Sequence, residues 1–354
     1  MHKLDVDSFL ALKDKLAVTD DAHVFDVRTP AEFEQGHIIG AKNLPLFTDE
    51  ERVQVGTTYK KKGREKAILL GLDFIGPKMR SFVDEVIRVA GQPQADKPIL
   101  MHCWRGGMRS SSVSWLMNLY GFEVRVLEGG YKAWRGRGRE RFDAPLKLRV
   151  ISGRTGSGKT DVLEAMEKQN TQVLHLEGLA HHRGSAFGAV GLPPQPTVEQ
   201  YENLLHEAIR HFDVDKEVWI EDESRMVGRC RIPEELWGQL RKAPAIFVAS
   251  KMEARLDRLV RDYGDADKEP LRAAFTAIEK RLGGQNVKAA LQALDDDNVR
   301  EAAVIALKYY DQAYDRGKSR RIEDETRVAG EFDVDGAPDE VASRLLASKD
   351  EFFR

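Results

Sequence analysis

Short apolar runs alternate with amphipathic stretches along most of this chain. The runs have the length of strands, and they lie at residues 23–27, 99–101, 148–152, 173–176, 217–220 and 245–248. Apolar runs of this length between helical patterns are typical of buried strands in a parallel sheet. The pattern therefore predicts an α/β protein with strands in both halves of the chain.

Helical periodicity marks two further regions. Residues 46–95 form a long insertion whose apolar side chains recur at helical spacing, namely Phe82, Val83, Val86, Ile87 and Val89. A second helical region follows Lys251 and includes residues 271–282 and 299–314. We therefore expect helices added to both α/β cores.

A charged joint separates the two cores. Residues 135–145 alternate arginine with small or acidic residues and end at Pro145. We predict a first domain over residues 1–140 and a second over residues 141–354. The joint is interpreted either as a flexible linker or as a surface for phosphate groups, which suit the guanidinium fork.

Composition narrows the function classes. The 354 residues are 42% hydrophobic and 32% charged, as in a globular protein. The formal net charge of −3 gives no overall attraction to nucleic acid, so RNA contacts have to come from local basic patches. The two cysteines form no Cys-x-x-Cys pair, which excludes a disulfide scaffold and a cysteine-rich zinc site. A charged N-terminus and the lack of an apolar run of about 20 residues predict a cytoplasmic protein without a membrane span.

The strand at residues 99–101 leads into a loop that carries Cys103 and ends at Arg109. Between them lie the loop residues Trp104, Arg105, Gly106 and Gly107. A helix is predicted from Ser110, so the thiol faces the N–H groups of a tight loop and the positive end of a helix dipole. Both favour the thiolate, which is the nucleophilic form. An inert core cysteine is the alternative, but it would not need the two glycines and Arg109.

Two chemistries use a Cys-x5-Arg loop: the hydrolysis of phosphate esters and sulfur transfer through a persulfide. The flanking sequence resembles the rhodanese family at residues 25–33, 36–38, 41–45 and 126–130. The loop has one residue more before Arg109 than the usual rhodanese loop, and this length resembles the phosphatases built on the same fold. The longer loop keeps phosphatase chemistry open, and it equally accepts a bulkier chalcogen anion.

The strand at residues 148–152 leads into a complete P-loop, G-x-x-x-x-G-K-[ST], at residues 153–160. The predicted phosphate-binding residues are Gly153, Gly156, Ser157, Gly158, Lys159 and Thr160. Glycines allow the backbone N–H groups to surround a phosphate, and the lysine adds a positive charge.

Charged clusters follow later strands of the second domain. The strand at residues 217–220 is followed by Glu221, Asp222 and Glu223, at the position of a Walker B carboxylate. These three residues either bind a metal or act as a general base, or they are ordinary polar residues at the end of a strand. The metal is left unassigned. Arginines 255, 258 and 261 share one helix face and either form surface salt bridges or close over phosphates.

Three other features carry weaker signals about function. The basic run at residues 60–66 is either a solvated face or an RNA contact. The loop at residues 181–188 is either an ordinary polar turn or a loop that contacts the substrate near the P-loop. Cys230 has no anion-binding surroundings and is interpreted as structural.

Together, these motifs resemble the bacterial tRNA 2-selenouridine synthases. The resemblance is carried by residues 103–110, 153–160, 176–185 and 219–225, and it extends to about residue 320. It implies an N-terminal rhodanese-like domain with the helical insertion, followed by a P-loop NTPase-like α/β domain with a helical C-terminal part.

The resemblance also implies an activity. The sulfur of 2-thiouridine at the wobble position of tRNA is geranylated with geranyl diphosphate and then replaced by selenium from selenophosphate. In this scheme Cys103, next to Arg109, carries selenium as a perselenide or attacks the activated carbon, and the P-loop holds the diphosphate. No tightly bound cofactor is expected, Mg²⁺ is left open, and the expected partners are tRNA and a supplier of selenophosphate. The arginines expected to contact tRNA are Arg135, Arg137, Arg139 and Arg141.

Two other classes compete with this interpretation. The first is a cysteine-dependent phosphatase fused to a P-loop small-molecule kinase, which would turn over ATP without RNA. The second is a non-catalytic RNA-binding protein, against which Cys103 and the complete P-loop argue.

Overall fold

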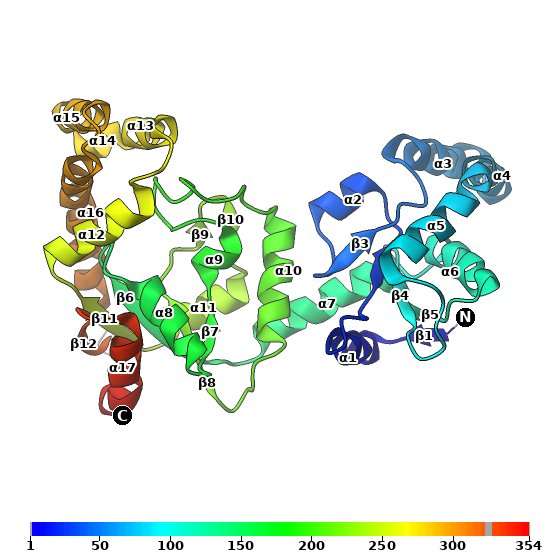
Figure 1. Ribbon diagram of the computed structural model, residues 1–354, viewed down its shortest axis with the longest axis horizontal. Coiled ribbons are helices and arrows are strands. Elements are labelled where there is room, and N and C mark those ends of the chain that lie inside the picture. Colours follow the sequence, from blue (N-terminus) through cyan, green and yellow to red (C-terminus); the bar gives the residue numbers. More distant parts are fainter. Residues whose placement is uncertain (1, 323–327, 354) are drawn as a thin grey trace. The chain divides into compact units, whose positions relative to one another are not determined.

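The computed structural model describes residues 2–322 and 328–353, and the chain divides into two compact units, Met1–Arg141 and Phe142–Arg354 (Figure 1). Each unit contains one five-stranded parallel sheet with its own hydrophobic core. The α/β class predicted from the alternation of apolar runs and helical patterns is therefore confirmed.

The first unit has the strand order β1-β5-β4-β2-β3, and all neighbouring strands are parallel. Its strands are β1 (His2–Leu4), β2 (Val24–Asp26), β3 (Ala41–Asn43), β4 (Ile99–His102) and β5 (Val124–Leu127). Its helices outside the insertion are α1 (Val6–Ala17), α2 (Pro30–Gln35), α6 (Met108–Tyr120) and α7 (Gly130–Asp143). Strand β4 lies in the middle of the sheet and is buried throughout. The loop that follows it therefore starts at the centre of the carboxyl edge, where parallel sheets place their sites.

The insertion predicted over residues 46–95 is helical, as expected. It consists of α3 (Asp49–Lys62), α4 (Arg64–Ile75), a short 3₁₀ turn (Gly76–Lys78) and α5 (Met79–Ala90). Helix α5 buries Phe82, Val83 and Val86 against the sheet. Helix α3 begins with a capping box of Thr48 and Glu51 but buries no side chain. Helices α3 and α4 lie side by side and leave much of their apolar surface exposed (Figure 1).

The second unit has the strand order β12-β11-β6-β8-β7, again with parallel neighbours. Its strands are β6 (Lys147–Gly153), β7 (Gln172–Leu174), β8 (Glu217–Glu221), β11 (Ala245–Ala249) and β12 (Val328–Asp333). The helices that connect them are α8 (Lys159–Lys168), α9 (Leu176–Ala180), α10 (Val198–Ile209) and α11 (Glu234–Lys242). A small antiparallel pair, β9 (Met226–Val227) and β10 (Cys230–Arg231), carries Cys230 into the core. Strand β6 is central, so the P-loop also starts at the middle of a carboxyl edge.

The helical part predicted after Lys251 is present. It comprises α12 (Met252–Tyr263), α13 (Lys268–Ala277), α14 (Glu279–Leu282), α15 (Gly284–Asp295) and α16 (Val299–Ile322). Helices α13, α14 and α15 gather at one end of α16 (Figure 1), where a separate apolar cluster contains Phe187, Phe275 and Leu294. In the described part of the chain, we find no helix that is long and apolar enough to cross a membrane.

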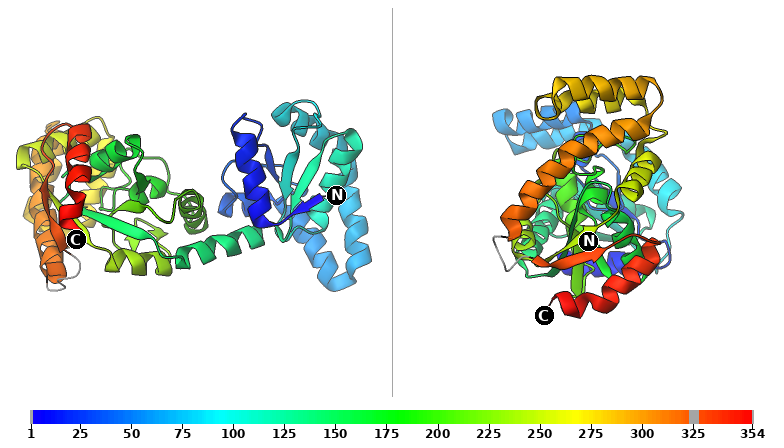
Figure 2. Two further views of the ribbon diagram at one scale, coloured as in Figure 1. Left: turned by 90° about the horizontal axis from the view of Figure 1, so that it is seen from below. Right: turned by 90° about the vertical axis from the view of Figure 1, so that its left-hand side faces the viewer.

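The structure differs from the sequence pattern at two places in this unit. The apolar run at residues 173–176 ends as a strand at Leu174, because Leu176 begins α9 and its N–H donates to the Glu221 carboxylate (2.7 Å). The helical part is followed by β12, which pairs with β11 at the edge of the sheet, and by α17 (Pro338–Phe352), which packs against α8 (Figure 2). The β12 residues lack a clear apolar alternation, so the strand depends on its pairing with β11.

The charged joint is helical rather than flexible. Residues 135–141 belong to α7, which extends from Gly130 to Asp143. In a helix, positions two residues apart point about 200° apart. Arg135 and Arg139 therefore share one face of α7, while Arg137 and Arg141 share another. The interpretation of this segment as a flexible linker is wrong, and the four arginines do not form one surface.

Candidate functional site

Cys103 lies at the floor of the loop between β4 and α6. Its side chain is only 3% exposed, and Sγ lies 3.3 Å from Ser110 Oγ at the first turn of α6. The carbonyl oxygens of Cys103 and Trp104 accept hydrogen bonds from Tyr131 and Lys132 of α7 (2.9 and 3.0 Å). Because a peptide N–H points opposite to its C=O, the N–H groups of Trp104 and Arg105 point away from α7. Backbone donors that point to one side of a loop are of the kind that bind an anion.

Glycine is required where the loop meets α7. A Cβ on Gly106 would lie 2.7 Å from the carbonyl oxygen of Leu127, and one on Gly130 would lie 2.3 Å from that of Cys103. Both glycines also have positive φ, of 62° each. The close backbone contact therefore fixes the shape of the cysteine loop.

Arg109 ends the loop and forms a bidentate ion pair with Glu32 of α2, which includes a 3.1 Å bond from Nη2 to Oε1. Burial alone would raise the pKa of Glu32, but the hydrogen bond and charge of Arg109 outweigh it and hold the pKa below its usual value. Glu32 also accepts the Thr29 N–H (2.9 Å) in the capping box of α2. Arg109 is therefore held in one orientation at the end of the cysteine loop.

The P-loop connects β6 to α8 with the geometry that its sequence predicts. Gly156 and Gly158 have φ of 74° and 90°, and the Lys159 ammonium folds back to the carbonyl oxygen of Gly153 (3.0 Å). The Ser157 hydroxyl is buried and lacks a hydrogen-bond partner among the described residues. A phosphate oxygen in the loop would supply that partner.

Two arginines of α12 support this loop from outside. Arg255 donates to the carbonyl oxygen of Thr155 (2.9 Å) and is held by Asp311 of α16. Arg258 donates to that of Gly156 (3.2 Å), so its guanidinium reaches the P-loop cavity. The third arginine of the stripe, Arg261, pairs with Asp161 at the start of α8. Arg258 also lies 3.6 Å from Asp161, so all three arginines form salt bridges, while closure over a phosphate stays a prediction.

Carboxyl groups face the P-loop from the neighbouring strands. Burial, reinforced by Glu177, raises the pKa of Glu221 to about 8. Burial and Glu177 also raise the pKa of Glu223 well above its usual value. Asp222 accepts a hydrogen bond from Ser152 at the end of β6 (2.6 Å). Glu223 and Asp222 line the P-loop cavity, whereas Glu221 is fully buried and positions α9.

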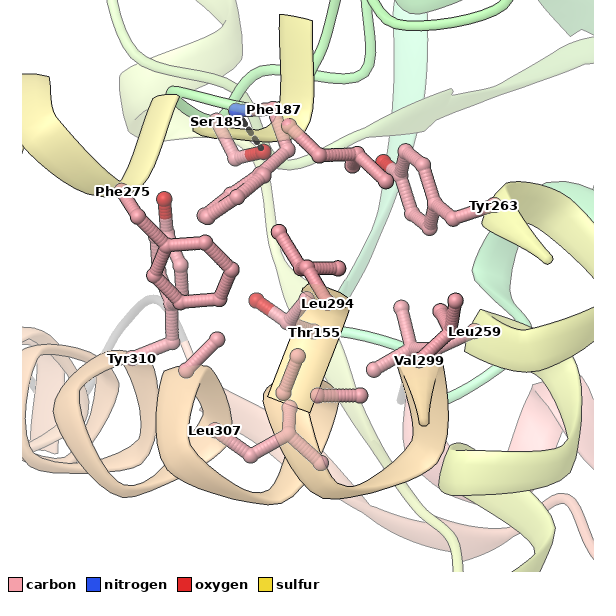
Figure 3. Close-up of a pocket in the computed structure, with 14 residues that line it drawn as sticks. Thr155, Ser185, Phe187, Leu259, Tyr263, Phe275, Leu294, Val299, Leu307 and Tyr310 are labelled. Atoms are coloured by element: carbon pink, nitrogen blue, oxygen red, sulfur yellow. Dashed lines mark hydrogen bonds between the residues drawn. The ribbon is translucent and has the colours of Figure 1, made fainter. Parts of the chain in front are cut away.

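An apolar cavity adjoins the P-loop cavity (Figure 3). The two share Thr155, Ser185, Leu259, Tyr263 and Tyr310 as walls. Beyond these residues the apolar cavity is lined by hydrophobic side chains alone, which include Phe187, Phe275 and Leu294. Two of its polar wall groups are engaged by the backbone: the Tyr310 hydroxyl accepts the Ala186 N–H (3.2 Å) and the Ser185 hydroxyl accepts the Phe187 N–H (3.2 Å).

Sequence reasoning located the cysteine loop and the P-loop but missed the residues that surround them. The sequence allows two interpretations of residues 181–188, an ordinary turn or a loop that contacts the substrate. In the structure, Arg183, Gly184 and Ser185 of this segment line the P-loop cavity. Glu32 and Glu177 were not singled out, because a carboxylate on a short helix has no pattern of its own. The apolar cavity combines side chains of α12, α13, α15 and α16, whose proximity only the fold determines. In the described ranges, no group of three or more His, Cys, Asp or Glu side chains is arranged to hold a metal ion.

A rhodanese-like sheet with a cysteine loop and a second sheet with a P-loop and facing carboxyl groups define a fusion of a rhodanese-like unit with a P-loop unit. Residues 6–137 match the model of the rhodanese-like domain, and residues 146–334 match that of the tRNA 2-selenouridine synthase AAA domain. The chain belongs to the tRNA 2-selenouridine synthase family.

Three relatives of that name match between 68% and 95% of the chain. The tRNA 2-selenouridine synthase of Marinobacter nauticus is 33% identical over 95% of each chain. That of Shewanella sediminis is 36% identical over 74% of this chain and 75% of its own. That of Bdellovibrio bacteriovorus is 40% identical over 68% of this chain and 64% of its own.

Proposed function

We propose that this protein is an enzyme that replaces the sulfur of 2-thiouridine in tRNA by selenium, in two steps carried out by its two units. The names of its relatives support the overall exchange. The P-loop unit geranylates the sulfur with geranyl diphosphate, and the cysteine loop then transfers selenium from selenophosphate. The base is the wobble uridine of the anticodon.

The observation that carries the first step is the apolar cavity that opens beside the P-loop (Figure 3). A nucleotide bound at the P-loop would need hydrogen-bond partners for its base and ribose, and the hydrophobic side chains beyond the shared walls provide none. A prenyl diphosphate matches both parts, because its head is an anion and its tail is a hydrocarbon. This match also separates the proposal from the phosphatase–kinase alternative, which requires a site for ATP.

In the first step, the sulfur of 2-thiouridine attacks the terminal carbon of the geranyl group. The carbon–oxygen bond breaks, pyrophosphate leaves, and the N3 proton of the base is lost. The P-loop N–H groups and Lys159 stabilise the charge on the leaving group. Glu223 is placed to receive the proton, since it lines the cavity and its raised pKa makes it a stronger base than an ordinary carboxylate.

A magnesium ion would suit this diphosphate. The Thr160 hydroxyl and the Asp222 carboxylate line the cavity and are hard oxygen ligands of the kind that Mg²⁺ takes beside phosphate oxygens. Bound there, the ion would neutralise part of the pyrophosphate charge. We expect no tightly bound organic cofactor.

In the second step, the Cys103 thiolate attacks the phosphorus of selenophosphate. The phosphorus–selenium bond breaks, and the released hydrogen selenide attacks C2 of the geranylated base. Geranylthiolate leaves and takes a proton, while the proton of the selenide passes to N3. Water then hydrolyses the phosphocysteine to thiolate and phosphate, so no oxidant or reductant is consumed.

Attack on phosphorus is preferred to the two other roles of Cys103. A perselenide made from selenophosphate would need a two-electron oxidant, which the reaction lacks. Attack on the base carbon would bring a nucleobase to a thiol that is 3% exposed at the floor of its loop. A small tetrahedral anion can enter the cradle formed by the loop N–H groups and Arg109.

Mass spectrometry of nucleosides tests the scheme. RNA that contains 2-thiouridine should gain a geranyl group when the protein and geranyl diphosphate are added without ATP. Addition of selenophosphate should then convert the product to 2-selenouridine, with release of geranylthiol and phosphate. ATP turnover without any change to the RNA would instead support the phosphatase–kinase alternative.

A further inference from the structure

The helical insertion forms a second apolar groove, beside the cysteine loop of the first unit. Helix α3 contributes Val55 and Tyr59, and helix α4 contributes Ile68 and Leu72. The opposite wall is the start of α6, with Met108 and Arg109. The groove therefore reaches the arginine that closes the Cys103 anion cradle.

The side chains of this groove are unusually exposed for their type. Tyr59, Leu72 and Met108 are 59%, 58% and 56% exposed, and α3 buries no side chain at all. Contiguous exposed apolar surface of this kind marks a binding site rather than a stabilising core. Two helices that contribute so little to the core are explained better by a ligand than by the stability of the fold.

The rim of the groove is basic. Arg52 and Arg64 line the groove itself, and exposed Lys60, Lys61 and Lys62 follow on the last turn of α3. A ligand that fits this surface has an apolar chain, a reacting group at the cysteine loop and surrounding negative charge. An RNA that carries an alkyl chain on its reacting base has all three properties.

We propose that the groove between α3, α4 and α6 binds the prenyl chain of the S-alkylated base while selenium is transferred. This proposal rests on the proposed function, in which the base reaches the mouth of the cysteine loop as a geranyl thioether and is attacked there by the released selenide. The insertion thus makes the rhodanese-like domain specific for an alkylated RNA. The prenyl chain affects the binding of the RNA and not the chemical step, because geranylthiolate and methylthiolate are similar leaving groups.

Two RNA substrates distinguish an effect of the prenyl chain on binding from an effect on the replacement of sulfur by selenium. Selenophosphate is supplied with RNA that contains either S-geranyl- or S-methyl-2-thiouridine, and 2-selenouridine is measured. We expect the protein to convert the geranyl substrate with a kcat/KM about a hundredfold higher than the methyl substrate, since burial of several methylene groups in the groove stabilises the complex. If the protein converts both equally, the groove proposal fails and the proposed function stands. If it converts neither, both fail.

A matched pair of variants locates the effect. Leu72 lines the groove, whereas Leu69 of the same helix is 57% exposed and does not. Leu72→Glu should raise KM for the geranyl substrate about tenfold and leave the methyl substrate unchanged. Leu69→Glu should change neither, and geranylation, which takes place in the other unit, should be normal in both variants and report correct folding.

Two results would overturn the assignment. The first is an equal effect of Leu72→Glu and Leu69→Glu on the geranyl substrate. The second is a change of oligomeric state in Leu72→Glu, measured by light scattering, with an unchanged preference for geranyl over methyl; the groove would then bind a second copy of the chain.

Discussion

Glu32 of α2 holds both terminal nitrogens of Arg109, so the arginine of the cysteine loop is positioned by a helix that begins 79 residues earlier in the chain, at Pro30. A guanidinium fixed in this way cannot rotate freely, so its remaining N–H donors keep fixed directions. The pairing also links the anion cradle to the Thr29 capping box.

Glu32→Gln tests this positioning. Glutamine retains an oxygen that can accept the Thr29 N–H, but it loses one of the two carboxylate oxygens that hold Arg109. We expect selenium transfer to fall about tenfold, the usual effect of losing one charge-assisted hydrogen bond. The rate is measured on geranylated RNA with saturating selenophosphate. An unchanged rate would show that Arg109 orients itself without Glu32.

Cys103→Ser separates the two steps. The substitution should abolish formation of 2-selenouridine and leave geranylation intact, because only the second step uses the thiolate. Mass spectrometry of the RNA nucleosides should show the geranylated base accumulating. Normal levels of 2-selenouridine in this variant would contradict a nucleophilic role for Cys103.

Lys159→Ala should have the opposite effect. Without the ammonium at the P-loop, the pyrophosphate leaving group loses its nearest positive charge, and geranylation should fall by about a hundredfold or more. RNA that is already geranylated should restore selenium incorporation by the same variant. If it does not, the division of the two steps between the units is wrong.

Glu221→Gln tests the buried carboxyl group at the end of β8. The folded state raises the pKa of Glu221 from 4.5 to about 8, so between these values it binds a proton that the unfolded state releases. The free energy of unfolding of the native chain should therefore fall as pH rises through this window, by up to about 1.4 kcal/mol per pH unit. Glutamine cannot ionise and still accepts the Leu176 N–H.

Urea unfolding at about pH 5.5 and about pH 7.5 measures this effect. The stability of Glu221→Gln relative to the native chain should increase by about 2 kcal/mol between the two conditions. A difference that does not depend on pH would mean that Glu221 is ionised throughout.

The helical form of α7 sharpens the prediction about RNA. Arg139 is exposed, whereas Arg137 is engaged by Asp7 and Glu140. If Arg135 and Arg139 contact phosphates from their shared face, replacing both by glutamine should weaken tRNA binding. The slope of the logarithm of the binding constant against the logarithm of the salt concentration should then become shallower by about 0.9 per lost contact. Arg137→Gln serves as the control and should change the slope little. Equal slopes for all three proteins would assign the arginines of α7 to a solvated surface.

The sequence predicted the parts of the fold that depend on local pattern. Apolar runs predicted the central strands, and glycine spacing predicted the cysteine loop and the P-loop. Such loops are visible in the sequence because all their residues are adjacent in the chain. Strand β12 escaped prediction because its residues acquire strand structure by pairing with β11. The charged segment at residues 135–141 was ambiguous because alternating arginines fit a linker as well as a helix.

Sites built from distant segments were less predictable. Glu177 reaches the P-loop cavity from α9, and Glu32 reaches Arg109 from α2. Both apolar pockets need the packing of helices whose faces show only ordinary amphipathic spacing. A sequence pattern identifies an apolar face, but the three-dimensional arrangement decides whether a neighbour or a ligand covers it.

The aromatic rings of Phe187 and Phe275 meet edge to face, 4.8 Å apart, in the part of the apolar cavity beyond the walls shared with the P-loop (Figure 3). If a prenyl diphosphate binds as proposed, with its head at the P-loop, these two rings would limit how much of the chain the cavity accepts. A bulkier chain would meet an aromatic surface there, so the two rings would contribute to the choice among prenyl donors.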